Sequence, residues 1–384
     1  MYGFSHLTFG QRKARKVAVQ VIPVIRYAEI DQKAELIPVD SSVSADRLAD
    51  YISTHFASDE ARVRALYRWL GCHISYDVAE MYSFSTEDEV PKLVNDLFIR
   101  RKAICEGYAQ AFTMVCQRMH IRSYVVSGLT KRGKTVAAVS HAWNAAWIDG
   151  QWFLFDPTWG AGYLDQQEFV ADPNDTFFMV TAGEFIPTHA PFDPLWQFLE
   201  RPVSHRDFMA GKTQTDLSTT FFNFTDSLKV YDRQSITEQK AAQIQRIERS
   251  GVYNDLTFSY LGMLKHNLLV AQSNALNNQY NSAVDVYNQT VVLVNQFVNY
   301  RNNQFRPQKP EQEVRAMLDS ISSNLVRMRF LTGQLSLDKT QLKGNIQLLE
   351  GLLLEVDKFL HEQKLFLTRY YKSPKFLRGL MFAK

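Results

Sequence analysis

The sequence has few cysteines and no long apolar run. Its three cysteines, Cys72, Cys105 and Cys116, are too few and too scattered for a disulfide framework or for a zinc cage of paired thiolates. The longest apolar stretch near the start, residues 17–25, is interrupted by a glutamine and a proline and is far shorter than the ~20 residues of a membrane span. A phosphate-binding loop and a glycine fingerprint are also absent, so nothing in the sequence indicates a nucleotide.

A large charge excess is absent too, since 43 basic and 40 acidic residues leave a net charge of +3. Residues 1–16 and 364–384 are basic and contain no acid. The basic, aromatic C-terminal end is compatible with weak contact with an anionic membrane surface, although a solvated terminus packed on its own domain is the favoured interpretation. No nucleic-acid partner is expected, and the oligomeric state stays open.

The first residues resemble a signal peptide, but the apolar run is short and no small-residue cleavage site follows it. We therefore expect a cytoplasmic protein, with export as the alternative.

The length of 384 residues predicts two or three domains. Apolar residues recur every three or four positions through four C-terminal segments, at 261–275, 280–298, 314–328 and, in a helix expected from Asp338 onward, 342–360. Stop signals at Asn277-Asn278, at two prolines near residue 308 and at Gly333 separate them, and Ser235 with Glu238 matches a capping box. Residues 235–384 are therefore predicted to be an all-helical bundle of four or five helices.

The middle of the chain has a different pattern. Helical periodicity over 45–69 and 101–119 is followed by short strands at 123–128, 140–148 and 151–158, which indicates an α+β domain over residues 46–200. Residues 1–45 are predicted to be an N-terminal extension. Residues 201–234 are predicted to be a connector with a strand at 221–224.

Asp149-Gly150 between two aromatic strands predicts a two-residue hairpin. This register makes Trp143 face Asp156 and His141 face Thr158, all on one face of the sheet. His141 and Asp156 then become diagonal neighbours within hydrogen-bond reach. A carboxylate that fixes the imidazole in this way suits a general base.

Cys105 is the predicted nucleophile because it lies in the first turn of a helix, where unpaired N–H groups and the helix dipole favour a thiolate. The basic residues at 100–102 are expected to add positive potential beside it. On its own, a single cysteine on an apolar helix is more often structural, so the surrounding residues have to decide. A zinc site made of Cys105, His141 and Asp156 is the less favoured alternative.

The surrounding residues resemble a known family. Residues 101–109 (RKAICEGYA) resemble the nucleophile motif of the transglutaminase-like superfamily, 140–144 (SHAWN) its histidine motif, and 152–162 (WFLFDPTWGAG) its aspartate motif. Residues 74–77 (ISYD) resemble a segment upstream of the cysteine, and residues 189–199 resemble the continuation found in a bacterial subgroup related to kyphoscoliosis peptidase. The resemblance covers about residues 46–200. Ala103 is a departure, since many members carry glycine there.

The resemblance implies a papain-like core with a Cys-His-Asp triad. Carried over by motif, Cys105 is the nucleophile, His141 the general acid and base, and Asp156 the residue that orients His141. Thiolate attack on a peptide or protein amide would form a thioester, which water or an amine then resolves. The backbone N–H of Cys105 is the expected oxyanion donor, no second donor is identified, and Trp143 and Tyr76 are candidates for the substrate-binding wall.

No cofactor is expected, and the expected partner is a peptide or protein substrate. The sequence favours hydrolysis slightly over transamidation. The alternative is a non-catalytic transglutaminase-like scaffold whose helical C-terminal domain mediates protein interactions.

Overall fold

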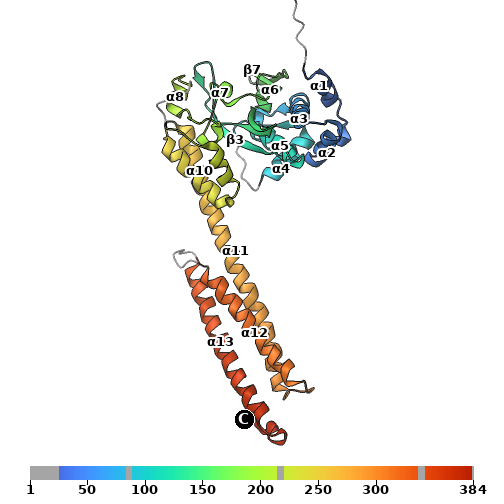
Figure 1. The fold of residues 1–384 in the computed structure, drawn as a ribbon, viewed down its shortest axis with the longest axis vertical. Coiled ribbons are helices and arrows are strands. Elements are labelled where there is room, and N and C mark those ends of the chain that lie inside the picture. The colour runs from blue at the N-terminus through green and yellow to red at the C-terminus, as the bar shows by residue number, and fades with distance from the viewer. Residues whose placement is uncertain (1–25, 84–88, 214–219, 336–341, 383–384) are drawn as a thin grey trace, which may run out of the picture. The chain divides into compact units, whose positions relative to one another are not determined.

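The computed structural model describes residues 26–83, 89–213, 220–335 and 342–382 (Figure 1). The chain forms two compact units. One comprises residues up to 232 together with 246–258, and the other comprises 233–245 together with 259–384. The predicted domain boundaries at residues 45, 200 and 234 stay predictions. Residues 1–25, which hold the first part of the predicted extension, and Asp338, the predicted start of the last helix, lie outside the described residues.

The first unit combines helices with short strands, which confirms the α+β prediction. Its helices are α1 (Ala28–Glu35), α2 (Ala45–His55), α3 (Asp59–His73), α4 (Val90–Arg100), α5 (Cys105–Arg118), α6 (Pro157–Ala161), α7 (Ala182–Phe185), α8 (His205–Met209) and α9 (Phe224–Tyr231), with 3₁₀ turns η1 (Val39–Ser41), η2 (Val78–Glu80) and η4 (Pro194–Gln197). Its strands are β1 (Ser75–Tyr76), β2 (Lys102–Ala103), β3 (Ser123–Arg132), β4 (Thr135–Val136), β5 (His141–Ile148), β6 (Gln151–Phe155), β7 (Gly162–Asp165), β8 (Glu168–Ala171) and β9 (His189–Pro191).

The central sheet has the order β4-β3-β5-β6, and β9 also pairs with β3; all of these pairings are antiparallel. The β5–β6 hairpin has the predicted register, with Trp147 opposite Trp152. Asp149 and Gly150 both have positive φ, at 48° and 88°, as a type I′ turn requires. The turn chemistry of these two residues therefore determines the pairing of both strands.

Helix α5 packs on this sheet and is tied to it by a buried side chain. Asn144 on β5 donates its amide to Ala109 O on the helix at 2.8 Å and to the Thr113 hydroxyl at 2.9 Å. Asn144 is fully buried, so water does not compete for these hydrogen bonds. Because Asn144 lies three residues after His141, the same contact places the start of α5 relative to the start of β5.

Two details of this unit were predicted wrongly. Strand β6 ends at Phe155, and Thr158 lies in α6, so the predicted pairing of His141 with Thr158 does not form. Pro157 ends the strand because it lacks an N–H and has the φ of a first helical residue. The predicted strand at 221–224 is also wrong, since α9 begins at Phe224, where Asn223 caps it by accepting from Asp226 N.

The second unit is helical, as predicted. Helices α10 (Ile236–Ser250) and α11 (Asp255–Asn302) contribute residues to both units, and α12 (Glu311–Gly333), α13 (Lys343–Lys372) and η5 (Lys375–Phe382) complete the second. The capping box at α10 forms, with Glu238 accepting from Ser235 N at 2.8 Å and Ser235 accepting from Glu238 N at 3.4 Å. The apolar positions of α12 and α13 interlock with those of α11, including buried Phe297, Leu318 and Leu353.

The predicted break at Asn277-Asn278 is wrong, because α11 runs through it as one helix of 48 residues. Asparagine lowers helix propensity only by a fraction of a kcal/mol, about 0.7 at most, which packing along a long helix outweighs. In the part of the chain that the structure describes, we find no helix that is long and apolar enough to cross a membrane.

Candidate active site

Cys105 is the first residue of α5, where the sequence analysis placed the nucleophile. Ile104 is the N-cap and is extended, so the N–H groups of the first turn have no acceptor within the helix. The preceding strand β2 approaches this turn closely: a Cβ on Gly107 would lie 2.7 Å from the Cβ of Ala103. Gly107 therefore makes room for the alanine that departs from the family motif. Cys105 keeps part of its surface accessible, whereas Cys116 is buried.

His141 and Asp156 meet as predicted. His141 begins β5, Asp156 follows the last residue of β6, and His141 Nε2 donates to Asp156 Oδ2 at 2.8 Å. Asp156 is fully buried and His141 almost so. With Nε2 held by the carboxylate, Nδ1 is the ring nitrogen of His141 that remains for the thiol of Cys105.

Asp156 is also the N-cap of α6. Its Oδ1 accepts from the backbone N–H groups of Thr158 at 2.9 Å and Trp159 at 3.0 Å. Burial acts to raise the pKa of Asp156, but the charges and hydrogen bonds of His141 and His189 hold it well below its usual range. The carboxylate is therefore ionised over the whole physiological pH range.

His189 is a component of the site to which the sequence analysis gave no role. It lies on β9 and its Nε2 is 3.1 Å from Asp156 Oδ2, the same oxygen that His141 binds. The pairing of β9 with β3 brings it there, and this approach needs Gly128 on β3, where a Cβ would lie 2.2 Å from Ala190 O. The only sequence signal was its place in the segment that resembles the family's continuation.

The tautomer of His189 follows from its partners. An ionised carboxylate only accepts, so the nitrogen facing it, Nε2, carries the hydrogen, and Nδ1 accepts from the Thr188 hydroxyl at 2.7 Å. Burial, together with the nearby positive charge of His141, lowers the pKa of His189 to about 4 despite the attraction of Asp156. His189 is thus a neutral donor that is fully buried.

The opposite holds for His141. Burial acts to lower its pKa, but the charge and hydrogen bond of Asp156, with a further contribution from the neighbouring Cys105 thiol, raise it to about 10. At neutral pH His141 is therefore an imidazolium, with a hydrogen on both ring nitrogens. The influence of Cys105 on His141 connects the third member of the predicted triad to the other two.

His141, Asp156 and His189 also offer three metal-ligand atoms within 4.8 Å of one another. Their spacing fits hydrogen bonds better than a metal ion. Atoms bound ~2.1 Å from one tetrahedral zinc would stand ~3.4 Å apart, whereas the two histidine nitrogens are 2.8 and 3.1 Å from the shared oxygen. Cys105 is not part of this group, so the zinc set considered in the sequence analysis is not assembled.

Aromatic rings surround the two histidines. Trp143 is fully buried and packs edge-on against His189, with ring centroids 5.1 Å apart. Tyr76 is partly exposed, and burial together with the nearby Cys105 raises its pKa, which places it beside the nucleophile. Contact of Trp143 and Tyr76 with substrate stays a prediction. Trp159, which was not predicted as a site residue, is partly exposed, and its ring centroid lies 5.5 Å from that of His141.

The basic residues before Cys105 have partners of their own, and their effect on the thiol stays a prediction. Arg100 and Lys102 pair with the buried carboxylate of Asp77, at 2.7 and 3.5 Å. Arg101 turns away and donates to Ser42. Two of the three cations therefore share one carboxylate, and the third is bound to Ser42.

Comparison with known proteins agrees with this site. The family model of the transglutaminase-like superfamily matches residues 46–157, which include Cys105, His141 and Asp156. The chain contains a transglutaminase-like domain. At the level of the superfamily, this domain belongs with cysteine enzymes. Its α+β architecture agrees with that assignment.

Two curated relatives are similar to part of the chain. Kyphoscoliosis peptidase from Mus musculus is 30% identical over 190 residues, which is 47% of this chain, and that from Homo sapiens is 30% identical over 191 residues, which is 48%. The chain spans only 28% of the length of either relative.

Among solved structures, the chain is similar to a TGase, with 20% identity over 40% of this chain and 37% of that one, at a TM-score of 0.24. It is also similar to the periplasmic domain of TgpA from Pseudomonas aeruginosa bound to ethylmercury, with 22% identity over 34% of this chain and 49% of that one, at a TM-score of 0.26.

Proposed function

We propose that the transglutaminase-like domain is a thiol-dependent acyl-transfer enzyme that acts on amide groups of peptides or proteins through a thioester on Cys105. The observation that carries this proposal is the 2.8 Å bond between His141 and a fully buried, ionised Asp156. A histidine held in this way is a stable imidazolium whose Nδ1–H can pair with a thiolate, as a cysteine nucleophile at neutral pH requires.

The reaction is expected to proceed in two halves. With the Cys105 proton already on His141 Nδ1, the thiolate attacks the amide carbonyl, and the N–H of Cys105 donates to the oxyanion. His141 then returns the proton to the leaving nitrogen as the C–N bond breaks, which leaves the acyl group on sulfur. In the second half, water or an amine attacks the thioester, loses its proton to His141 and regenerates the thiolate.

The molecule that accepts the acyl group from the thioester distinguishes a peptidase or amidase from a protein-glutamine transamidase. One observation favours hydrolysis: the curated relatives bear the name peptidase. This is weaker support than the contact between His141 and Asp156. We therefore expect hydrolysis to predominate, with transamidation appearing only at high amine concentration.

A glutamine-containing peptide incubated with the full chain, with and without a primary amine, tests the proposal. Mass spectrometry should detect a hydrolysed or amine-linked product and a transient mass increase on Cys105. Cys105→Ala should abolish all three signals, whereas Cys72→Ser, which alters an exposed cysteine, should leave them unchanged. Turnover that survives Cys105→Ala would refute the assignment. Absence of turnover with any peptide amide would favour the scaffold alternative.

A further inference from the structure

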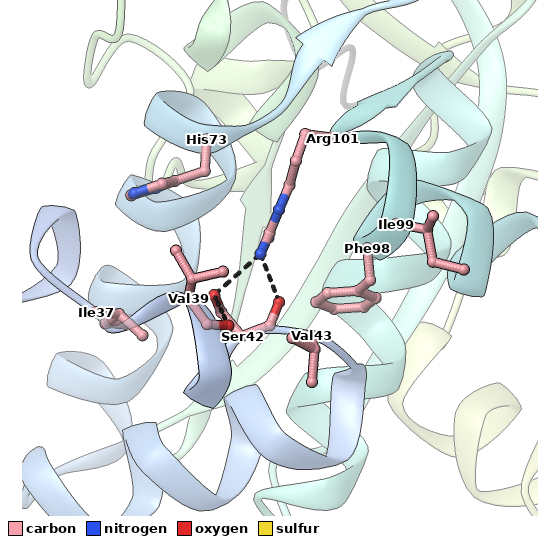
Figure 2. A pocket seen from close by; sticks show the side chains of 8 residues that line it. All are labelled: Ile37, Val39, Ser42, Val43, His73, Phe98, Ile99 and Arg101. Carbon is pink, nitrogen blue, oxygen red and sulfur yellow. Dashed lines mark hydrogen bonds between the residues drawn. The ribbon is translucent and has the colours of Figure 1, made fainter.

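A second recessed site lies on the first unit, between the η1 segment and the C-terminal end of α4 (Figure 2). Its volume is about 520 Å³, and it shares no residue with the triad. Five apolar side chains line it: Ile37, Val39, Val43, Phe98 and Ile99. The first two come from the segment after α1, and the last two from α4, so the pocket is formed by parts of the chain that are about 60 residues apart in sequence.

A single guanidinium enters this apolar pocket. Arg101 Nη2 donates to Ser42 O at 2.8 Å and to the Ser42 hydroxyl at 3.1 Å, as Figure 2 shows, and its guanidinium lies 4.9 Å from the centre of the Trp69 ring. Its Nη1 is buried and has no hydrogen-bond partner. The guanidinium therefore has only the neutral oxygens of Ser42 as hydrogen-bond acceptors among the described residues.

Among the described residues, no carboxylate pairs with Arg101, although other arginines of this unit have one. Arg64 is bound by Asp31 and Asp175, and Arg100 by Asp77. The only influence on the pKa of Arg101 is burial, which lowers it. The pocket therefore contains a positive charge that lacks a counter-charge.

The walls beside Arg101 are more exposed than apolar side chains in a monomer usually are. Val39 is 72% exposed, Ile99 68% and Val43 47%, while Ile37 and Phe98 form a buried floor. A concave apolar surface with one incompletely paired arginine at its centre resembles the core of a protein interface, where arginine and large apolar residues predominate.

We propose that this pocket binds a polypeptide segment in which a carboxylate side chain is flanked by apolar side chains. The carboxylate pairs with the guanidinium of Arg101, and the flanking side chains cover Val39, Val43 and Ile99. Charge complementarity selects an acid, and the exposed apolar wall requires neighbours that remove it from water. The first 25 residues of this chain contain no Asp or Glu, so they offer no carboxylate for this role.

An array of octapeptides tests the proposal. Each pair on the array differs only by Glu or Gln at position five, with Leu, Ile, Val or Phe on both sides, and is probed with the full-length Cys105→Ala chain so that no peptide is cleaved. The best pair is then measured by fluorescence anisotropy. The Glu peptide should bind about 10- to 100-fold more tightly than its Gln counterpart, as expected for a charge-assisted hydrogen bond.

Variants assign this preference to the pocket. Arg101→Met should bind Glu and Gln peptides equally. Val39→Asp, at an exposed position, places an internal carboxylate beside Arg101 and should weaken binding of the Glu peptide without affecting the fold. Arg47→Met alters an exposed arginine on α2 that does not line the pocket and should change nothing.

Three outcomes would overturn the proposal. The first is equal binding of Glu and Gln peptides to the parent chain. The second is a preference for Glu that survives both Arg101→Met and Val39→Asp. The third is binding of octanoate that is lost in Arg101→Met while no peptide binds, which would identify the site as one for small amphiphilic acids.

Discussion

At the residue scale, Asp156 accepts four hydrogen bonds, two on each carboxylate oxygen: Oδ1 from the N–H groups of Thr158 and Trp159, and Oδ2 from His141 and His189. These four donors stabilise the ionised form of the carboxylate, and its negative charge stabilises a protonated His141. The buried aspartate is thus the residue on which the protonation state of the site depends.

The pH dependence of the proposed reaction follows from this arrangement. Because the pKa of His141 is raised to about 10, the imidazolium that protonates the leaving group persists to alkaline pH. We expect kcat/KM to fall only above about pH 9. In Asp156→Asn the raising charge is gone, so the alkaline fall should move to lower pH and kcat should drop. A pH–rate profile of both proteins checks this, and an alkaline limb that stays in place would contradict it.

His189 is expected to be a positioning residue. In His189→Phe the aromatic packing is retained but Asp156 loses one donor, which is worth about a 10-fold or greater loss in kcat for a bond to a charged group. KM should stay within about twofold, since His189 is buried and touches no substrate. His189→Gln, which keeps an N–H donor, should recover part of the loss. Steady-state kinetics of the two variants provide the test, and equal losses in both would contradict a role for the hydrogen bond.

The sequence allowed the pairing of His141 with Asp156 to be predicted, because a two-residue turn fixes the register of its hairpin. It did not allow the role of His189 to be predicted, because β9 reaches β3 across about 60 residues and no local rule gives that pairing. For the same reason the partner of Arg101, a residue nearly 60 positions earlier, was not foreseen.

At the scale of elements, α1 is attached to the transglutaminase-like domain by a buried arginine. Arg64 on α3 is almost fully buried and donates twice to Asp31 on α1, both at 2.6 Å, and once to Asp175 at 2.7 Å. The predicted extension at 1–45 therefore includes a helix that packs on the domain core, with α1 residue Ala34 fully buried.

Asp31→Ala should be strongly destabilising. It leaves a buried guanidinium with only one carboxylate, which we expect to lower the free energy of unfolding by about 2–4 kcal/mol. Asp175→Ala is the matched control, because Asp175 is 61% exposed, and it should cost less than about 1 kcal/mol. Chemical denaturation monitored by tryptophan fluorescence measures both. Equal effects would show that burial of the pair is not what matters.

Element boundaries were predicted well where a residue enforces them and poorly where only propensity was available. The turn at Asp149-Gly150 and the capping box at Ser235 were confirmed because each satisfies a specific backbone requirement. The break at Asn277-Asn278 was wrong because a weak propensity does not interrupt a helix that is packed along its length.

At the scale of the whole molecule, the chain contains separate hydrophobic cores. One is built from residues 27–179 of the first unit, and another from residues 280–382 of the second. The sequence pattern indicated both, since a helical period and a mixed pattern follow one another along the chain. We expect calorimetry to resolve two unfolding transitions. Asp31→Ala should lower the midpoint temperature of only one of them. A single transition that shifts as a whole would contradict independent cores.

The relative reactivity of the cysteines shows whether His141 activates Cys105. Cys72 is exposed, Cys105 is only partly so, and burial raises the pKa of the Cys72 thiol. Accessibility alone therefore predicts that iodoacetamide modifies Cys72 first. A nucleophile activated by His141 reverses this order: at pH 7, mass spectrometry should find Cys105 carboxamidomethylated at least about 10 times faster than Cys72, with the advantage lost in His141→Ala. Equal rates, or faster modification of Cys72 in the native chain, would contradict a nucleophile activated by His141.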